Sequence, residues 1–166
     1  MALAEFTVAG ALVESGDGLL LVCNRRRNGS TDWTPPGGVI DPDDESILHG
    51  LAREVEEETG LVVTEWEGPL YEVRATAPAM GWALRCEVHR AVSYAGHLLV
   101  DDPDGIVVDA RFAAPAECAA ILAGCARWVA EPLADWLDAR WGPHGAREYV
   151  YEVLGADRAA MRAVRV

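Results

Sequence analysis

The N-terminal part of the chain alternates short apolar runs with turn-forming residues, a pattern typical of β-strands. Residues 5–14 and 19–25 predict two strands. The stretch Ser15-Gly16-Asp17-Gly18 between them has the composition of a tight hairpin turn. We therefore expect a β-hairpin near the start of the chain.

A break in regular structure is predicted next. Residues 26–32 are polar, and Pro35, Pro36, Gly37 and Gly38 follow soon after. Two prolines followed by two glycines cannot continue a helix or a strand. We expect this segment to have a specialised, irregular backbone.

The clearest helix in the chain begins near Glu45. Its apolar stripe has helical spacing and consists of Ile47, Leu48, Leu51 and Val55. The acidic cluster Asp41, Asp43 and Asp44 precedes the stripe and can cap the first amides of the helix. Gly60 is placed to end the helix in the left-handed conformation.

The rest of the chain mixes strands and helices. Strands are predicted over residues 61–64, 70–75, 83–91, 106–112 and 148–154, and helices over residues 115–123 and 127–139. Because the two kinds of element do not alternate strictly, we expect an α/β fold of the α+β type, with a mixed β-sheet between helices. No repeat or linker interrupts the sequence, so residues 1–166 are predicted to form one domain.

Composition narrows the possible partners. A net charge of −13 argues against an extended nucleic-acid partner, but it allows a small anionic substrate if a cation accompanies it. No signal peptide or membrane-spanning run is evident, so we expect a cytoplasmic protein with no membrane contact. The four cysteines have no zinc-binding spacing and are expected to be reduced core residues.

Three glutamates of the predicted helix carry its candidate chemistry. Glu54, Glu57 and Glu58 are related by i, i+3 and i+4, so they share one edge, which borders the apolar stripe. Glu56 points to the other side. Crowded carboxylates repel one another, and a hard cation such as Mg²⁺ relieves this repulsion. The alternative is a plain solvated acidic face.

The segment from Gly38 to Leu61 resembles the Nudix box, G-x5-E-x7-R-E-U-x-E-E-x-G-U, in which U is aliphatic. The matching residues are Glu45, Arg53, Glu54, Val55, Glu57, Glu58, Gly60 and Leu61. One departure is that six residues instead of five separate Gly38 from Glu45. Asp44 would restore this spacing but break the next one, so the resemblance favours Glu45.

The resemblance extends over roughly residues 5–124 and implies a Nudix-type α/β/α sandwich with a mixed β-sheet. Residues 125–166 are left as a C-terminal extension that contains Trp128, Trp136 and Trp141. Two interpretations of these tryptophans stay open: they cover the core of their own domain, or they form the interface of a homodimer.

The resemblance also implies a mechanism. In this family the box helix binds Mg²⁺, which Mn²⁺ can replace, and the bound metal grips a substrate diphosphate. Carried over to this chain, the metal ligands are Glu54, Glu57, Glu58 and the backbone carbonyl of Gly38. Arg53 would pair with Glu45 and hold the loop against the helix. Water would attack a phosphorus atom, with Glu54 or Glu57 as general base, so we expect a pyrophosphohydrolase.

Substrate contacts are predicted outside the box. In the basic run 25–27, the arginines either contact a phosphate, as expected of Arg25 and Arg27, or offset local acidity. Trp33 either stacks on a base or anchors a loop. Asp102 and Asp104 either supply a general base or form a turn.

The group attached to the diphosphate is left open. Pro78 lies seventeen residues after Leu61, close to a proline position found in some family members that cleave ADP-ribose, which favours a nucleotide sugar. A nucleoside triphosphate is the other candidate substrate, whereas RNA caps are disfavoured by the acidic composition. A non-catalytic nucleotide-binding or regulatory module is the competing function, and the extra residue before Glu45 is its support.

Overall fold

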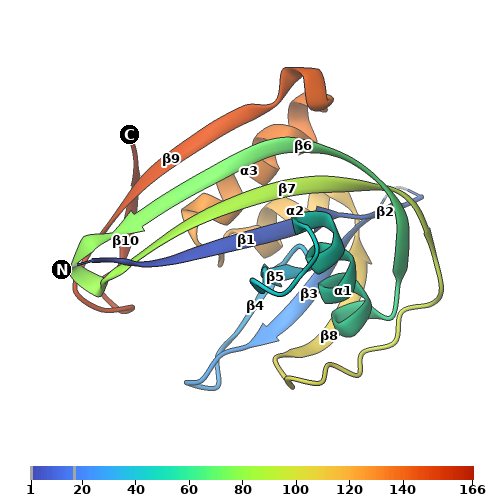
Figure 1. The fold of residues 1–166 in the computed structure, drawn as a ribbon, viewed down its shortest axis with the longest axis horizontal. Helices are drawn as coiled ribbons and strands as arrows, with labels where there is room; N and C mark the ends of the chain where they lie inside the picture. Colours follow the sequence, from blue (N-terminus) through green and yellow to red (C-terminus); the bar gives the residue numbers. More distant parts are fainter. Residues whose placement is uncertain (1, 17) are drawn as a thin grey trace.

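The computed structural model describes residues 2–16 and 18–166, and its strands form two sheets (Figure 1). The larger sheet has the order β10-β9-β6-β7-β1-β5. Its strands are β1 (Ala4–Leu12), β5 (Gly37–Val39), β6 (Val62–Ala77), β7 (Trp82–Ala95), β9 (Arg147–Leu154) and β10 (Arg162–Arg165). The β1–β7 and β6–β9 pairs are parallel and the others antiparallel, so the predicted mixed sheet is confirmed.

The smaller sheet pairs the short strands around the predicted hairpin. It contains β2 (Glu14–Ser15), β3 (Gly18–Arg25), β4 (Thr31–Thr34) and β8 (Val107–Ala113). β2 and β3 pair antiparallel, as expected, although Asp17 of the turn lies outside the described residues. The predicted strand over residues 5–14 is divided: β1 joins the larger sheet and only β2 joins the hairpin.

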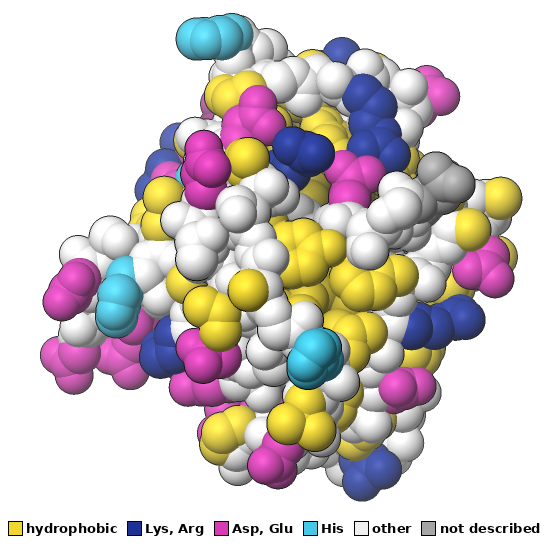
Figure 2. Space-filling view, turned by 90° about the vertical axis from the view of Figure 1, so that its right-hand side faces the viewer, with side chains coloured by type: hydrophobic (Ala, Val, Ile, Leu, Met, Phe, Trp, Pro, Cys, Tyr) yellow, Lys and Arg dark blue, Asp and Glu magenta, His cyan; other side chains and the backbone are white. Residues whose placement is uncertain are grey.

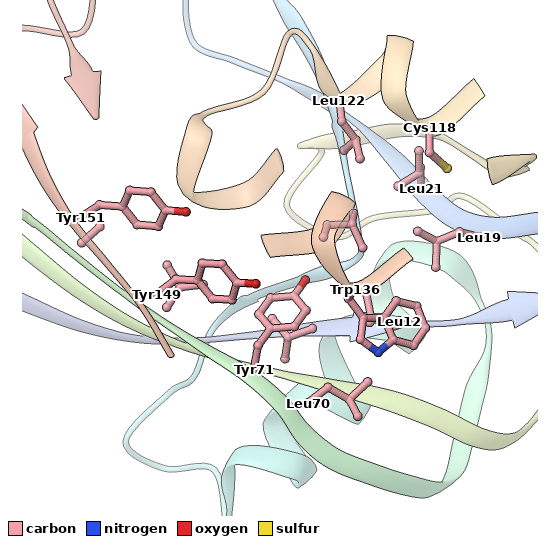
Figure 3. Packing of buried hydrophobic residues seen from close by; sticks show 14 of the residues in the cluster. Leu12, Leu19, Leu21, Leu70, Tyr71, Cys118, Leu122, Trp136, Tyr149 and Tyr151 are labelled. Atoms are coloured by element: carbon pink, nitrogen blue, oxygen red, sulfur yellow. The ribbon is translucent and has the colours of Figure 1, made fainter. Parts of the chain in front are cut away.

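Helices cover both faces of the larger sheet, which confirms the predicted sandwich. α1 (Ile47–Thr59) packs on one face and α3 (Arg127–Ala139) on the other, whereas α2 (Pro115–Leu122) packs against α3 and against β3 and β4 of the smaller sheet (Figure 1). Alternation along the strands separates the two cores: Leu20 joins the cluster beneath α1, whereas Leu19 and Leu21 join the cluster beneath α3 (Figure 3). Two 3-10 turns, η1 (Pro78–Met80) and η2 (Pro143–Gly145), lie in connections.

The start of α1 differs from the prediction. Its N-cap is Ser46, whose side chain accepts a hydrogen bond from the His49 amide at 3.0 Å. The preceding aspartates do not cap the helix, because they close a turn of their own, in which the Asp41 amide donates to Asp44 at 2.9 Å. The end is as predicted, since Gly60 adopts the left-handed conformation at a φ of 77°.

Several strands differ from the expected pattern. The predicted strands 61–64 and 70–75 are one strand, β6, whose pairing with β7 is irregular between Glu67 and Tyr71. The expectation of an irregular backbone is wrong for Gly37 and Gly38, which form the edge strand β5 against β1. β4, β5 and β10 have three or four residues each, too few for a period to be recognised.

Other structural findings bear on the predicted partners. All four cysteines are free, as predicted, and Cys23 and Cys118 are buried. No helix in the described parts of the chain is long and apolar enough to cross a membrane. On the face shown in Figure 2, basic side chains are scattered among acidic ones and do not gather into one basic surface.

The tryptophans of the C-terminal segment pack on the core of their own domain. Trp136 is only 3% exposed and lies in the cluster beneath α3, and Trp128 and Trp141 pack against that cluster. The Trp141 indole also donates to the Leu70 carbonyl of β6 at 2.7 Å. The core-covering interpretation is therefore confirmed for these side chains.

Replacing Trp136 by alanine should lower the free energy of unfolding by about 3–5 kcal/mol, because it leaves a cavity beneath α3. We expect a melting temperature lower by roughly 10 °C in thermal denaturation. Leu99→Ala is the control, since Leu99 is 68% exposed and should change melting little. A melting temperature for Trp136→Ala within a degree of wild type would contradict the packing described here.

Candidate active site

The three predicted carboxylates lie on one edge of α1, as the spacing required. Glu58 is buried at 6% exposure, the Glu54 side chain is 18% exposed, and that of Glu57 is 32% exposed. Glu56 is exposed on the other side of the helix. The acidic run is thus divided into a partly buried edge and a solvated face.

Glu58 is the most constrained of these groups. Burial, and after it the neighbouring charge of Glu54, raises the pKa of Glu58 to about 9. The carboxyl accepts a hydrogen bond from the Gly37 amide at 3.3 Å, which ties the helix to the edge strand. Burial likewise raises the pKa of Glu54, with the charge of Arg53 opposing the shift. Both carboxyls are therefore placed where a nearby cation would stabilise their ionised forms.

Arg53 connects the carboxylates to the preceding loop. Its guanidinium donates to Asp44 at 3.0 and 3.2 Å, to Glu54 at 3.1 Å and to Glu57 at 3.3 Å. The hydrogen bonds with Asp44 raise the pKa of Arg53 above its usual value and lower that of Asp44. The predicted pairing of Arg53 with Glu45 is wrong, because the turn closed by Asp44 directs that carboxylate toward the helix and Glu45 is exposed.

Two glycines allow this close packing. A Cβ atom at Gly50 would lie 2.6 Å from the Asp44 carboxylate, so the glycine leaves room for the partner of Arg53. A Cβ atom at Gly38 would lie 3.0 Å from the Glu54 carboxylate. Gly38 therefore leaves open the space between its backbone and the acidic edge of α1.

The loop between β7 and β8 lies beside the same edge. The Leu99 amide donates to the Thr59 carbonyl at 2.9 Å, which fixes the loop to the end of α1. Asp102 accepts hydrogen bonds from the amides of Ile106 and Val107 at 3.0 and 2.9 Å, so its predicted turn-forming role is confirmed. The charge of Asp102 also raises the pKa of Glu58, so this loop is electrostatically coupled to the site. Asp104 has the same effect on the pKa of Glu54.

A cavity of about 280 Å³ lies on the α3 side of the larger sheet and reaches Gly37 and Gly38. Arg26 lines it, held by Asp32 through two hydrogen bonds of 2.7 Å. The prediction that Arg25 and Arg27 contact a substrate phosphate is not supported. Both side chains are exposed, and neither is among the described residues that line the cavity. Arg27 lies beyond the end of β3, and Arg25 is its last residue.

The other residues that the sequence connected with substrate binding, Trp33 and Pro78, are not among the described residues that line this cavity. Trp33 packs against the core beneath α3, with the Arg111 guanidinium 5.2 Å from its ring centre, so it anchors the loop as the second interpretation held. Pro78 lies in η1 between β6 and β7 and is not among the described residues that line the cavity. Sequence reasoning missed Asn24 and Tyr71, which do line it. Asn24, a polar residue ending an apolar strand, offered a signal, whereas Tyr71 offered none.

The side chains present fit a divalent cation in their chemistry. Glu54, Glu57 and Glu58 supply carboxylate oxygens, and the missing Cβ of Gly38 leaves its backbone accessible to them. Within residues 2–16 and 18–166, no three acidic, histidine or cysteine side chains are already gathered as a metal-binding group. Arg53 holds Glu54 and Glu57, and the Gly37 amide holds Glu58.

Comparison with known proteins gives a consistent result. The family model for the NUDIX domain matches residues 5–145, which continues past the predicted limit at residue 124. Over 61 residues the chain is 48% identical to a MutT-like protein of Streptomyces ambofaciens. That alignment spans only 37% of either protein.

Solved structures show the same fold. A MutT NUDIX hydrolase from Burkholderia pseudomallei is 25% identical, with a TM-score of 0.59 over 68% of this chain and 84% of that one. The MutT protein of Bacillus halodurans is 21% identical, with a TM-score of 0.65 over 95% of this chain and 97% of that one. The second likeness covers nearly the whole chain.

Asp44→Asn should destabilise the protein more than Glu45→Gln. Asp44 holds Arg53 with two charge-assisted hydrogen bonds and closes the loop turn, whereas Glu45 is exposed. We expect the melting temperature of Asp44→Asn to fall by on the order of 5 °C, and that of Glu45→Gln to change by about 1 °C or less. The reverse order in matched thermal melts would restore Glu45 as the partner of Arg53.

Proposed function

Because the chain belongs to the NUDIX domain family, we propose that it is a Mg²⁺-dependent hydrolase of a phosphoanhydride bond in a small nucleoside diphosphate derivative. The observation that carries the proposal is the partly buried edge of Glu54, Glu57 and Glu58 facing Gly38. The substrate is a nucleoside triphosphate or a nucleotide sugar, since both contain the diphosphate that such an edge, with a cation, would bind.

The cation would be held by Glu54, Glu57 and Glu58 together with the Gly38 carbonyl. When bound, Mg²⁺ neutralises charge on the phosphoryl oxygens and lowers the pKa of a water molecule, and Mn²⁺ can replace it. Arg53 bonds both Glu54 and Glu57, so a change at one of these two carboxylates would alter the placement of the other.

The protein's own groups would position and deprotonate the attacking water. Arg53 orients Glu54 and Glu57 from one side, and its pairing with Asp44 keeps the guanidinium from swinging into the site. Either Glu54 or Glu57 accepts the proton of the water, because both carboxylates are partly accessible, whereas Glu58 is buried. The leaving phosphate departs toward solvent along the exposed side of the helix edge.

A catalytic role is favoured over a purely binding role. The binding-module alternative rested on the extra residue between Gly38 and Glu45. Asp44 absorbs that residue by closing the turn and pairing with Arg53, so the acidic edge is kept intact. A site that retains three carboxylates and their positioning arginine has the groups that hydrolysis needs.

Removing divalent metal should abolish turnover. We expect EDTA to stop hydrolysis of nucleoside triphosphates and nucleotide sugars, and added Mg²⁺ or Mn²⁺ to restore it, because Glu54, Glu57 and Glu58 are crowded acids. Phosphate or nucleoside monophosphate release measures the activity. Full turnover by exhaustively chelated protein would rule out the metal-dependent mechanism.

Glutamine substitutions should separate the acidic edge from the solvated face. Glu54→Gln, Glu57→Gln and Glu58→Gln keep the shape but remove the charge, so each should lower kcat on the order of a hundredfold or more, equivalent to about 2.7 kcal/mol. Glu56→Gln is the matched control from the same run, and it should stay near wild type.

Steady-state kinetics on proteins with matching melting curves provides the measurement. A pH-rate profile adds a second readout, because the variant that lacks the general base should lose the acidic limb of the profile. Equal losses in all four variants would mean that the helix edge has no special role in catalysis.

A further inference from the structure

A second pocket lies at the C-terminal end of α3. Its volume is about 310 Å³, close to the lower limit, roughly 300 Å³, of small-molecule sites. None of the described residues that line it also lines the cavity that reaches Gly37 and Gly38. Trp128 lines that cavity and Arg140 lines this pocket, and their spacing in the sequence corresponds to roughly 18 Å along the helix axis. The two spaces are therefore separate.

Two arginines from different parts of the fold meet in this pocket across one carboxylate. Arg90 of β7 donates to one oxygen of Glu14 at 3.2 Å, and Arg140, which follows α3, donates to the other oxygen at 2.7 Å. Arg90 also donates to Glu67 at 3.3 Å. Two guanidinium groups thus flank a single anionic group, an arrangement that also suits a phosphate group.

The backbone of Arg140 is unusual. Its φ is 53°, and it is the one non-glycine residue within residues 2–16 and 18–166 that has a positive φ. The position ends α3, where glycine is the common residue because it has no Cβ atom. The Arg140 side chain compensates, since its guanidinium lies 4.6 Å from the Trp136 ring centre and bonds to Glu14. Unfavourable backbone conformations of this kind are concentrated at functional sites.

Both arginines retain donors for a ligand. Arg90 and Arg140 each use only their Nε and Nη1 atoms in hydrogen bonds with residues of the described ranges, which leaves each Nη2 group. Their side chains are 37% and 42% exposed, so a solute can reach them. The aromatic walls are fixed, because Trp136 donates to the Trp141 carbonyl at 3.1 Å and Trp141 donates to the Leu70 carbonyl at 2.7 Å. Figure 3 shows Trp136 close to Leu70.

We propose that this pocket binds a phosphate group between Arg90 and Arg140, in the position that the Glu14 carboxylate occupies when the pocket is empty. A phosphate dianion carries more charge than one carboxylate and has further oxygens for the Nη2 donors. The displaced Glu14 side chain turns toward solvent, while its carbonyl keeps the hydrogen bond from the Tyr94 hydroxyl at 2.7 Å. The inference does not depend on the proposed function, since none of these groups belongs to the acidic edge of α1.

Phosphate binding in the absence of metal tests this assignment. The probes are inorganic phosphate and ribose 5-phosphate in EDTA, and sodium chloride at matched ionic strength is the reference for general screening. Calorimetric titration should show at least one probe binding with a Kd of about 1 mM or tighter, and that probe should also raise the melting temperature. The probe that binds more tightly identifies free phosphate or a phosphate ester as the source of the group.

Glu14→Gln distinguishes a binding site from a structural ion pair. Because it removes the competing carboxylate, it should tighten phosphate binding by about tenfold, whereas Arg90→Gln and Arg140→Gln should each weaken it by about tenfold or more. Arg74→Gln is the matched control, since Arg74 also bridges two glutamates but is not among the described residues that line the pocket. It should leave phosphate binding unchanged.

Three results would overturn the assignment: wild type that binds neither probe, an unchanged affinity in Arg140→Gln, or folded Glu14→Gln that binds no more tightly than wild type. If melting curves show that Glu14→Gln does not fold, Arg90→Gln and Arg140→Gln compared with Arg74→Gln still decide. Failure of the proposed hydrolysis would appear only in turnover assays with Mg²⁺, and would leave these titrations unaffected.

Discussion

Electrostatic repulsion among the carboxylates of α1 is the constraint on which the candidate site depends. Glu54, Glu57 and Glu58 lie close together on one edge, and burial of Glu58 makes its charge costly. Arg53 offsets part of this repulsion, and Asp44 fixes the position of Arg53. Gly50, the fourth residue of α1, costs up to about 1 kcal/mol in helix propensity, but a larger residue would displace Asp44. The glycine therefore makes the helix less stable locally, but the space it leaves lets Asp44 pair with Arg53.

The edge strand β5 links two chemically different surfaces. Its antiparallel pairing with β1 fixes Gly37 and Gly38 between the acidic edge of α1 and the apolar cavity beneath α3. A side chain at Gly37 would overlap the Ala9 carbonyl oxygen, and one at Gly38 would crowd Glu54. Because neither position can carry a side chain without a shift in its surroundings, the two surfaces are separated by little more than backbone.

Sequence patterns predicted the features that depend on local periodicity. They failed for contacts that depend on how a loop folds in three dimensions. The edge of Glu54, Glu57 and Glu58 follows from helical geometry alone, and so does the exposure of Glu56. Counting residues along the chain selected Glu45 as the partner of Arg53, but a turn closed by hydrogen bonds brings Asp44 there instead. Tyr71 was missed as a cavity-lining residue because, within a β-strand, a phenol that lines a cavity and one that fills a core have the same periodicity.

Charge balance constrains how this acidic chain could bind the anionic substrate proposed for it. A polyphosphate that approaches a chain of net charge −13 is repelled at long range, and Asp44 and Asp32 already pair with Arg53 and Arg26 near the site. In the proposed function, a divalent cation would supply positive charge for the phosphates, and the three carboxylates would hold it more firmly once a phosphate shares it. An acidic protein could in this way bind an anion, because the cation would offset the repulsion.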